Sequence, residues 1–296
     1  MAVIKVREPA SAALREQIFD DFRSRLSKAL ALDHDLALYG IIPEIQKYFN
    51  SSRHFLNVAN AFISDFGNSD DIIQFQSDIS EATQRMEASA QKCLIERLSI
   101  CSDEQKTRVI RLLGEPNSDL RCPILNFERI PELQQERTIS GIGENSSVLI
   151  LGAGSISVSG LYFASHGARV TLLDRDSRAI EKFRSVHDLL PREIRDRITF
   201  DPACDARDYA FPQDVTHICL AALLEPKEPI IDKIRIAYGS CKAPLTVLIR
   251  TPRQDLMRLF YYDVDSSVLA GFKLVGKVDI GYEEQPANTL VMRLEY

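Results

Sequence analysis

The sequence lacks the paired cysteine and histidine spacings that commonly bind metal ions. None of its six cysteines forms a Cys-x-x-Cys pair, and its five histidines show neither His-x-x-x-His nor His-Glu-x-x-His spacing. These absences exclude the common structural zinc sites and favour reduced, packed thiols, as in a cytosolic chain. We therefore expect a protein that binds no metal.

Long apolar runs and a surplus of positive charge are also absent. No stretch has the roughly 20 consecutive apolar residues of a membrane span, and the N-terminus lacks the apolar core of a signal peptide. The 36 lysines and arginines are outnumbered by 42 aspartates and glutamates, for a net charge of -6. This balance excludes the basic surface typical of nucleic-acid or anionic-membrane binders. We expect a cytoplasmic globular protein with a small-molecule partner, no nucleic acid and no membrane.

The first part of the chain has helical periodicity. Its apolar residues recur at four-residue steps, as in Leu14, Ile18, Phe22, Leu26 and Leu30. Further helices are expected at residues 43–49, 55–66, 70–98, 103–113 and 131–139. Ser102 is placed to cap the helix at 103–113. Because 296 residues suffice for two domains, we predict an all-helical N-terminal domain over residues 1–137 that closes the substrate site.

The pattern changes to that of buried strands near residue 140. Strands are expected at residues 147–151, 169–173, 197–200 and 215–220, with helices between them. This alternation is typical of a parallel, doubly wound sheet. Three later strands, at 246–249, 272–275 and 290–294, are separated by too little helix for repeated crossovers, so an antiparallel hairpin at one sheet edge is expected. We predict an α/β fold with a Rossmann-like domain over residues 138–296.

Glycines and carboxylates mark the predicted site. Gly152, Ala153 and Gly154 follow the first strand, where glycine lets a ligand approach the backbone and the next helix supplies free N–H groups. Asp174 comes 20 residues after Gly154, at the end of the second strand, where a carboxylate can accept hydrogen bonds from both ribose hydroxyls. Asp205 follows the third strand and is placed to contact an adenine amino group. The alternative is that both carboxylates are solvated loop residues.

The glycine pattern also distinguishes between two nucleoside ligands. A dinucleotide site has a third glycine for close helix packing beside the pyrophosphate, but this chain has Ser157 there. A short Gly-x-Gly with acidic residues after the second and third strands suits a mononucleoside without a pyrophosphate. The sequence therefore favours S-adenosylmethionine over a nicotinamide dinucleotide.

Several segments of the second half resemble nicotianamine synthases and the related opine-metallophore synthases. The glycine-rich segment 151–160 is similar to theirs, and further similar segments follow in the same order at residues 221–227, 247–251, 257–262, 271–272 and 287–291. The resemblance covers most of residues 138–296 and only parts of the helical half. It places Ala221 among the cofactor-binding residues.

The resemblance implies an unusual use of S-adenosylmethionine as a substrate. An amine attacks the carbon next to the sulfonium in the methionine-derived arm, the 3-amino-3-carboxypropyl group is transferred, and 5'-methylthioadenosine leaves. Because departure neutralises the sulfonium, positioning of the amine should dominate and no metal is needed.

The resemblance also suggests residues for substrate binding. Arg250 and Arg258 match arginines of the family motif, and a guanidinium binds a carboxylate in a bidentate manner. Tyr262 resembles the tyrosine that closes the same segment. The alternatives are solvated arginines and a packed tyrosine.

A glutamate is the expected base for the incoming amine. The segment 81–88 resembles the part of the family that carries it, and Glu87 matches better than Glu81. The two lie about 240° apart around a helix, so they cannot both face one pocket. Either can instead be a surface carboxylate.

The segment 123–130 departs from the family because it contains no tyrosine where relatives have a tyrosine-rich stretch. Asn126 and Phe127 are the residues expected to take over part of that role. The departure leaves two reactions open: transfer to an amino-acid acceptor, or cyclisation of S-adenosylmethionine itself to azetidine-2-carboxylate, which a more apolar pocket favours.

A small-molecule methyltransferase and a non-catalytic binding protein are two further hypotheses. The oligomeric state stays open, with a homodimer as a candidate.

Overall fold

A computed structural model describes residues 70–111, 130–201, 203–221, 224, 226–240, 244–252, 264–278 and 287–295, together with residues 20, 21, 24, 25, 27 and 28. The chain divides into two compact units. The larger combines Glu87–Pro252, Tyr261–Gly281 and Ala287–Tyr296, and the smaller combines Met1–Met86, Arg253–Phe260 and Tyr282–Pro286. The functional division predicted between residues 137 and 138 stays a prediction.

Helices precede the sheet in the sequence. Helix α4 covers Asp70–Ser99, α5 covers Asp103–Arg111, and α6 covers Ile130–Ser140, so the helices predicted in these regions are confirmed. Ser102 caps α5 as expected: the Gln105 N–H donates to its hydroxyl, and the Gln105 side chain accepts from the Ser102 N–H. The six described residues between 20 and 28 are helical. The helices expected at 43–49 and 55–66 lie outside the described residues.

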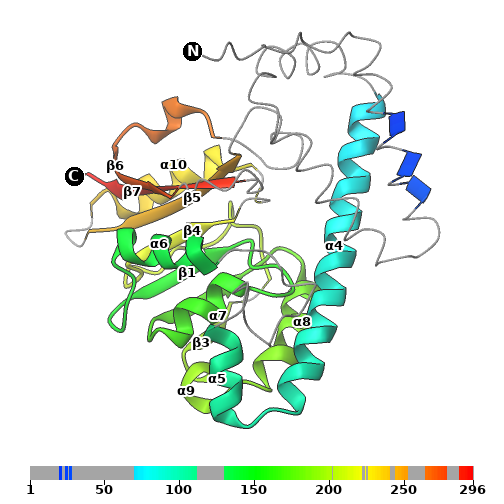
Figure 1. The fold of residues 1–296 in the computed structure, drawn as a ribbon. Coiled ribbons are helices and arrows are strands. Elements are labelled where there is room, and N and C mark those ends of the chain that lie inside the picture. Colours follow the sequence, from blue (N-terminus) through cyan, green and yellow to red (C-terminus); the bar gives the residue numbers. More distant parts are fainter. Residues whose placement is uncertain are drawn as a thin grey trace, which may run out of the picture. The chain divides into compact units, whose positions relative to one another are not determined.

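A seven-stranded sheet forms the centre of the larger unit (Figure 1). Its strands are β1 (Ser147–Leu151), β2 (Arg169–Leu173), β3 (Ile198–Phe200), β4 (His217–Leu220), β5 (Thr246–Pro252), β6 (Phe272–Val278) and β7 (Ala287–Leu294). The order is β3-β2-β1-β4-β5-β7-β6. The first five strands are parallel, whereas β7 runs antiparallel to both β5 and β6. The Rossmann-like α/β fold and the antiparallel hairpin at one edge are therefore confirmed.

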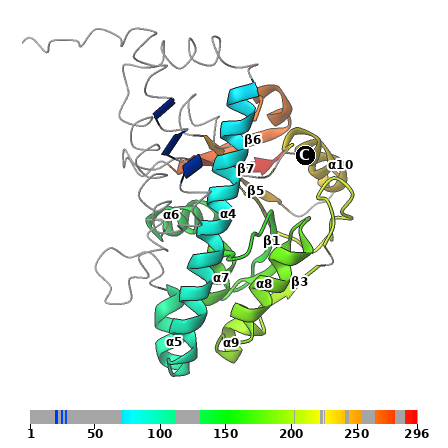
Figure 2. The ribbon, with the colours of Figure 1, turned by 90° about the vertical axis from the view of Figure 1, so that its right-hand side faces the viewer.

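Helices cover both faces of this sheet. The strand connections contain α7 (Val158–Ser165), α8 (Ser177–His187), α9 (Arg192–Arg195), α10 (Glu228–Tyr238) and the 3-10 helix η2 (Ser266–Leu269). Residues of α5, α6, α7 and α8 share one hydrophobic core with Val148 and Ile150 of β1, while α10 shares a second core with Leu149 and Leu151. Adjacent strand residues thus point to opposite faces. Figure 2 shows α6 on one side of the strands and α10 on the other.

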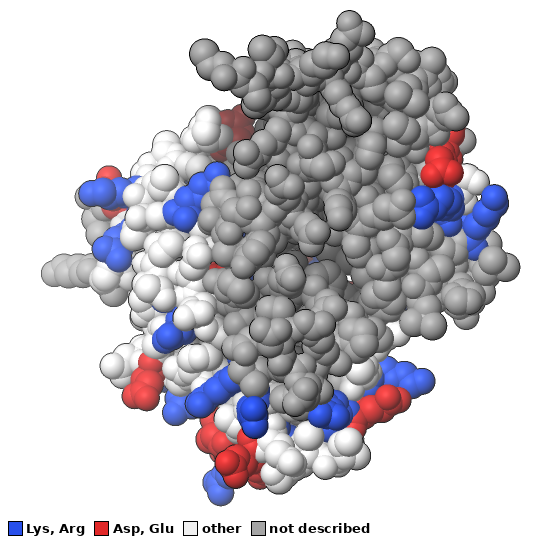
Figure 3. All heavy atoms as spheres, in the orientation of Figure 1, with Lys and Arg blue, Asp and Glu red and all other residues white. Residues whose placement is uncertain are grey.

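The described surface carries charges of both signs. Lys and Arg side chains are interspersed with Asp and Glu on the face seen in the space-filling view (Figure 3). Within the part of the chain that the structure describes, no helix is long and apolar enough to cross a membrane.

Candidate functional site

The loop after β1 is held against the ends of two neighbouring strands. The N–H groups of Gly152 and Ala153 both donate to the Leu173 carbonyl, at 3.0 and 3.1 Å. Gly152 and Gly154 have φ angles of 77° and 68°, which L-residues with side chains rarely adopt. A Cβ on Gly152 would lie 3.2 Å from the Ala221 Cβ. The structure therefore brings together four residues that were predicted to bind the cofactor: Gly152, Ala153, Gly154 and Ala221.

Asp174 connects this loop to the end of β2. Its half-buried carboxylate accepts one backbone N–H on each oxygen, from Gly154 at 2.8 Å and from Asp176 at 3.0 Å. An ionised carboxylate has about four acceptor positions, so each oxygen keeps one for a further donor. Two adjacent oxygens with one acceptor position each match the two adjacent hydroxyls of a ribose.

Asp205, after β3, already has several donors. Arg207 donates to it from Nε at 2.9 Å, from Nη2 at 2.7 Å and from its backbone N–H at 2.9 Å. The Arg207 guanidinium, with help from that backbone N–H, lowers the pKa of Asp205 to about 2. The carboxylate is thus charged at neutral pH, but an adenine amino group would share it with Arg207. The adenine-binding role of Asp205 stays a prediction.

The same loop contains a second polar pair, which was not predicted. The Tyr209 hydroxyl donates to the carboxylate of Asp201, the first residue after β3. Burial, together with this carboxylate, raises the pKa of Tyr209. Asp201 occupies the position after β3 that Asp174 occupies after β2, and this equivalence was visible in the sequence.

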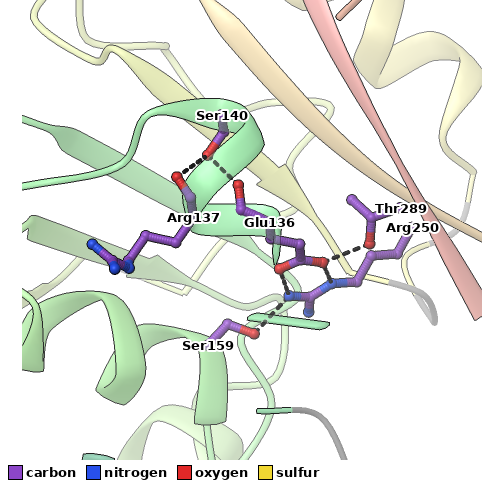
Figure 4. A network of polar contacts seen from close by, with 6 residues as sticks. All are labelled: Glu136, Arg137, Ser140, Ser159, Arg250 and Thr289. Carbon is purple, nitrogen blue, oxygen red and sulfur yellow. Dashed lines mark hydrogen bonds and ion pairs between the residues drawn. The ribbon is translucent and has the colours of Figure 1, made fainter. Parts of the chain in front are cut away.

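A buried network of charged and hydroxyl side chains lies near the end of β5 (Figure 4). The Arg250 guanidinium donates to Glu136 of α6 in a bidentate manner, from Nε to Oε1 at 3.0 Å and from Nη2 to Oε2 at 2.8 Å. Nη2 also donates to the Ser159 hydroxyl at 2.7 Å. The Thr289 hydroxyl of β7, directly opposite Arg250 in the register, donates to Glu136 Oε1. Four elements therefore meet at one ion pair.

This pairing bears on the predicted role of Arg250. The Arg250 and Glu136 side chains are only 10% and 1% exposed. Burial acts to lower the pKa of Arg250, but the neighbouring Cys219 sulfur and the Glu136 carboxylate outweigh it and the pKa is raised. We expected Arg250 to bind a ligand carboxylate in a bidentate manner, but its Nε and Nη2 donate to the Glu136 carboxylate instead. Glu136 could not be predicted from the sequence, because hydrophobic periodicity does not show which face of α6 contacts β5, where Arg250 lies 114 residues later.

Close packing of α7 on β2 depends on Gly160. A Cβ there would lie 2.9 Å from Leu172 Cδ2 and 2.9 Å from the Ser157 hydroxyl. A dinucleotide fingerprint has its packing glycine at the position of Ser157. In this chain Gly160, in the first turn of α7, provides that close approach.

The two glutamates predicted to act as the base lie in helix α4. Glu81 lies exposed in α4, and Glu87 lies in the same helix with a side chain outside the described set. Asn126, Phe127, Arg258 and Tyr262 also lie outside the described residues. No group of three or more His, Cys, Asp or Glu residues suited to a metal ion occurs among the residues that the structure describes.

Comparisons of the sequence with known proteins reveal a distant similarity. No family model matches the chain. It is 27% identical over 146 residues to L-histidine 2-aminobutanoyltransferase from Pseudomonas aeruginosa strain UCBPP-PA14, which is 49% of this chain and 53% of that protein. The protein of the same name from strain PAO1 matches to the same extent. The chain thus spans about half the length of the curated relatives it matches.

Solved structures show a likeness over nearly the whole chain. The crystal structure of MtNAS in complex with MTA and tNA has a TM-score of 0.66 at 15% identity, covering 97% of this chain and 100% of that chain. A glutamate-to-glutamine mutant of MtNAS in complex with S-adenosylmethionine has a TM-score of 0.65 at 16% identity, covering 97% and 99%. The chain therefore has a nicotianamine synthase-like fold, with a methyltransferase-type sheet preceded by helices, as the sequence resemblance implied.

Proposed function

We propose that the protein transfers the 3-amino-3-carboxypropyl group of S-adenosylmethionine to the amine of an amino acid and releases 5'-methylthioadenosine. The observation that carries this proposal is the similarity to L-histidine 2-aminobutanoyltransferase, on a chain whose fold matches MtNAS over 97% of its length. The name of that relative makes L-histidine the first acceptor to test. The geometry after β1 and β2 supports the nucleoside part of the proposal independently.

Recognition of the nucleoside rests on Asp174 and the loop from Gly152 to Gly154. The acceptor position left on each Asp174 oxygen receives one ribose hydroxyl. The positive-φ glycines have no side chain that would block the ligand, and α7 begins without a side-chain cap from Ser157, so its first N–H groups are the proposed donors to the ligand. Asp205 and Ala221 are the proposed contacts to the adenine.

The chemistry is a displacement at the carbon next to sulfur. The neutral amine of the acceptor forms a new C–N bond, the C–S bond breaks, and its electron pair moves to the sulfonium, which leaves as the neutral thioether of methylthioadenosine. The amine loses one proton to a base, for which Glu87 and then Glu81 are the proposed residues. The protein's main contribution is alignment of the amine with the C–S bond. No step requires a metal.

The carboxylates of the two amino-acid groups need cationic partners. Arg250 and Arg258 are the proposed ones, with Tyr262 as a further polar contact. Asn126 and Phe127 are proposed to border the acceptor amine. Of these residues the structure describes Arg250, whose guanidinium is fixed by Glu136.

A second reaction is supported by one sequence observation, the absence of tyrosine from residues 123–130. In this alternative the α-amine of S-adenosylmethionine attacks its own γ-carbon and forms azetidine-2-carboxylate, with the same release of methylthioadenosine. It requires no acceptor.

Product analysis by mass spectrometry tests the proposal. We expect enzyme-dependent methylthioadenosine and, with L-histidine present, an adduct heavier by one aminobutyrate unit. Equal amounts of methylthioadenosine and azetidine-2-carboxylate without any acceptor would establish cyclisation instead. Formation of S-adenosylhomocysteine would contradict both and indicate a methyltransferase. A reaction without enzyme corrects for spontaneous decomposition of S-adenosylmethionine.

A further inference from the structure

The hydrogen-bond donors of Arg250 are unequally used. A guanidinium has five N–H donors. One from Nε and one from Nη2 point to Glu136, and the second from Nη2 points to the Ser159 hydroxyl. Among the described residues, the two donors of Nη1 have no hydrogen-bond partner. The edge of Arg250 that faces away from Glu136 therefore keeps donor capacity.

Ser159 adds a donor at the same edge. Its oxygen accepts from Arg250 Nη2, so its own proton points away from the guanidinium, and it has no acceptor for that proton among the described residues. Figure 4 shows the Ser159 hydroxyl on the side of the guanidinium that faces away from Glu136. The Nη1 donors and the Ser159 hydroxyl thus form a composite edge that matches the two oxygens of a carboxylate.

Glu136 is itself held from two sides. Its Oε1 accepts from both Arg250 Nε and the Thr289 hydroxyl, and its side chain is 1% exposed. A carboxylate fixed in this way restricts rotation of the guanidinium and leaves only the composite edge for a ligand. Its negative charge also offsets that of Arg250, so recognition at this edge depends on hydrogen-bond geometry more than on net charge.

The composite edge lies close in the chain to the nucleoside-binding loop. Ser159 is in the first turn of α7, five residues after Gly154, whose N–H donates to Asp174. In the proposed function the methionine-derived arm extends from a ribose held by Asp174. A carboxylate at the end of that arm is the ligand group that fits two adjacent donors.

We propose that Glu136 is a positioning residue and that Arg250 Nη1 and the Ser159 hydroxyl together receive the carboxylate of the methionine-derived arm of S-adenosylmethionine. This inference rests on the proposed function and deepens it. In the alternative arrangement, Arg250 Nε and Nη2 break their hydrogen bonds to Glu136 and bind the ligand carboxylate instead. The two arrangements predict opposite effects when the charge of Glu136 is removed.

Calorimetry with two matched ligands tests the inference. S-adenosylmethionine and its decarboxylated form, S-adenosyl-3-methylthiopropylamine, differ only by the carboxylate. Ser159→Ala and Glu136→Gln should each raise the Kd of S-adenosylmethionine roughly 10- to 100-fold, because a hydrogen bond to a charged group is lost or misdirected. The Kd of the decarboxylated form should change less than about twofold. Ser159→Thr, which keeps the hydroxyl, should restore binding.

Ser165→Ala is the matched control, because Ser165 is a buried serine of the same helix whose hydroxyl donates to the Tyr162 carbonyl. It should change neither Kd. A lower Kd of S-adenosylmethionine for Glu136→Gln would overturn the inference, because it would show that Glu136 competes with the ligand for Arg250 Nε and Nη2. An equal rise in the Kd of both ligands would also overturn it, because Glu136 and Ser159 would then have structural roles only. If the unmodified protein binds neither nucleoside, the proposed function itself fails. If Glu136→Gln does not fold, the Ser159 variants still decide.

Discussion

Among single residues, Asp174 and Asp205 follow neighbouring strands but differ in how many hydrogen bonds their carboxylate oxygens can still accept. Asp174 takes one backbone N–H on each oxygen, whereas Asp205 takes three N–H groups from Arg207 alone. Because acceptor capacity is limited, Asp174 is the better-prepared partner for a ligand. Affinity for the nucleoside should therefore depend most on Asp174.

Asp174→Ala should raise the Kd of S-adenosylmethionine by about 100-fold or more. The substitution removes two hydrogen bonds to ribose, each worth about 1.5–3 kcal/mol when one partner is charged. Calorimetry with the purified variant measures the change. Asp188→Ala is the control, because Asp188 is an exposed residue at the end of α8 with an 80% exposed side chain. Equal affinity of the Asp174 variant and the unmodified protein would remove Asp174 from the site.

Gly160→Ala should destabilise the fold by about 1–2 kcal/mol. A new Cβ would meet Leu172 and Ser157, both buried, and overpacking typically costs about 1–3 kcal/mol. The helix propensity of alanine offsets up to about 1 kcal/mol of this cost. Urea unfolding gives the difference. Gly143→Ala, where a Cβ would meet nothing within 4 Å, should change stability by less than about 0.5 kcal/mol. Equal stability of the two variants would contradict the close packing of α7 on β2.

At the scale of helices and strands, the Glu136–Arg250 pair connects α6 to β5 and, through Ser159 and Thr289, to α7 and β7. Its two charges are almost wholly withdrawn from water. The loss of one partner leaves the other charge buried and unpaired, which is more costly than the absence of both. The pair therefore fixes how α6 lies against the sheet as well as the orientation of Arg250.

Glu136→Ala and Arg250→Ala should each lower the free energy of unfolding by about 3–5 kcal/mol. In the double variant Glu136→Ala/Arg250→Ala, the loss should be well below the sum of the single losses, because the second substitution removes the charge that the first left unpaired. Chemical denaturation of the four proteins closes the cycle. Strictly additive losses would show that the two side chains do not interact energetically.

His217 connects another pair of elements, the start of β4 and the end of α6. Its buried ring lies 3.1 Å from the Ser140 carbonyl through Nε2 and 2.8 Å from the Thr216 hydroxyl through Nδ1. Burial lowers the pKa of His217 below the usual 6.5, and the charge of Arg293 acts in the same direction. Near pH 6.5 the folded protein therefore binds less of this proton than the unfolded chain does.

Stability should fall as the pH is lowered through about 6.5, because the unfolded state then binds more protons than the folded state. In His217→Gln the decrease in the free energy of unfolding between about pH 7.5 and 5.5 should be smaller. His166, whose pKa burial also lowers, is present in both proteins and contributes equally. Parallel stability curves would exclude His217 as a source of the pH dependence.

At the scale of the whole molecule, the sheet was largely predictable because buried parallel strands alternate with helices in a recognisable order. The strands Ser147–Leu151 and Arg169–Leu173 and the long helix α4 lie where the local pattern placed them. Asp174 followed from its place at a strand end. The structure adds that its carboxylate accepts from the Gly154 N–H.

Other features depend on contacts between distant parts of the sequence. Glu136 and Arg250 are 114 residues apart, and only the assembled sheet shows that α6 presents this carboxylate to β5. The insertion of β7 between β5 and β6 likewise follows from the folded arrangement of the strands. The involvement of Ser159 follows from the turn at Gly152 and Gly154, which determines where α7 begins.

In the proposed reaction, the bond that breaks joins sulfur to the aminobutyrate carbon, and the methyl group stays on sulfur. S-adenosylmethionine with a deuterated methyl group, incubated with the protein and L-histidine and followed by mass spectrometry, tests this directly. We expect all deuterium to stay in methylthioadenosine and none to appear in the amino-acid product. Deuterium on the acceptor, with unlabelled S-adenosylhomocysteine, would contradict it.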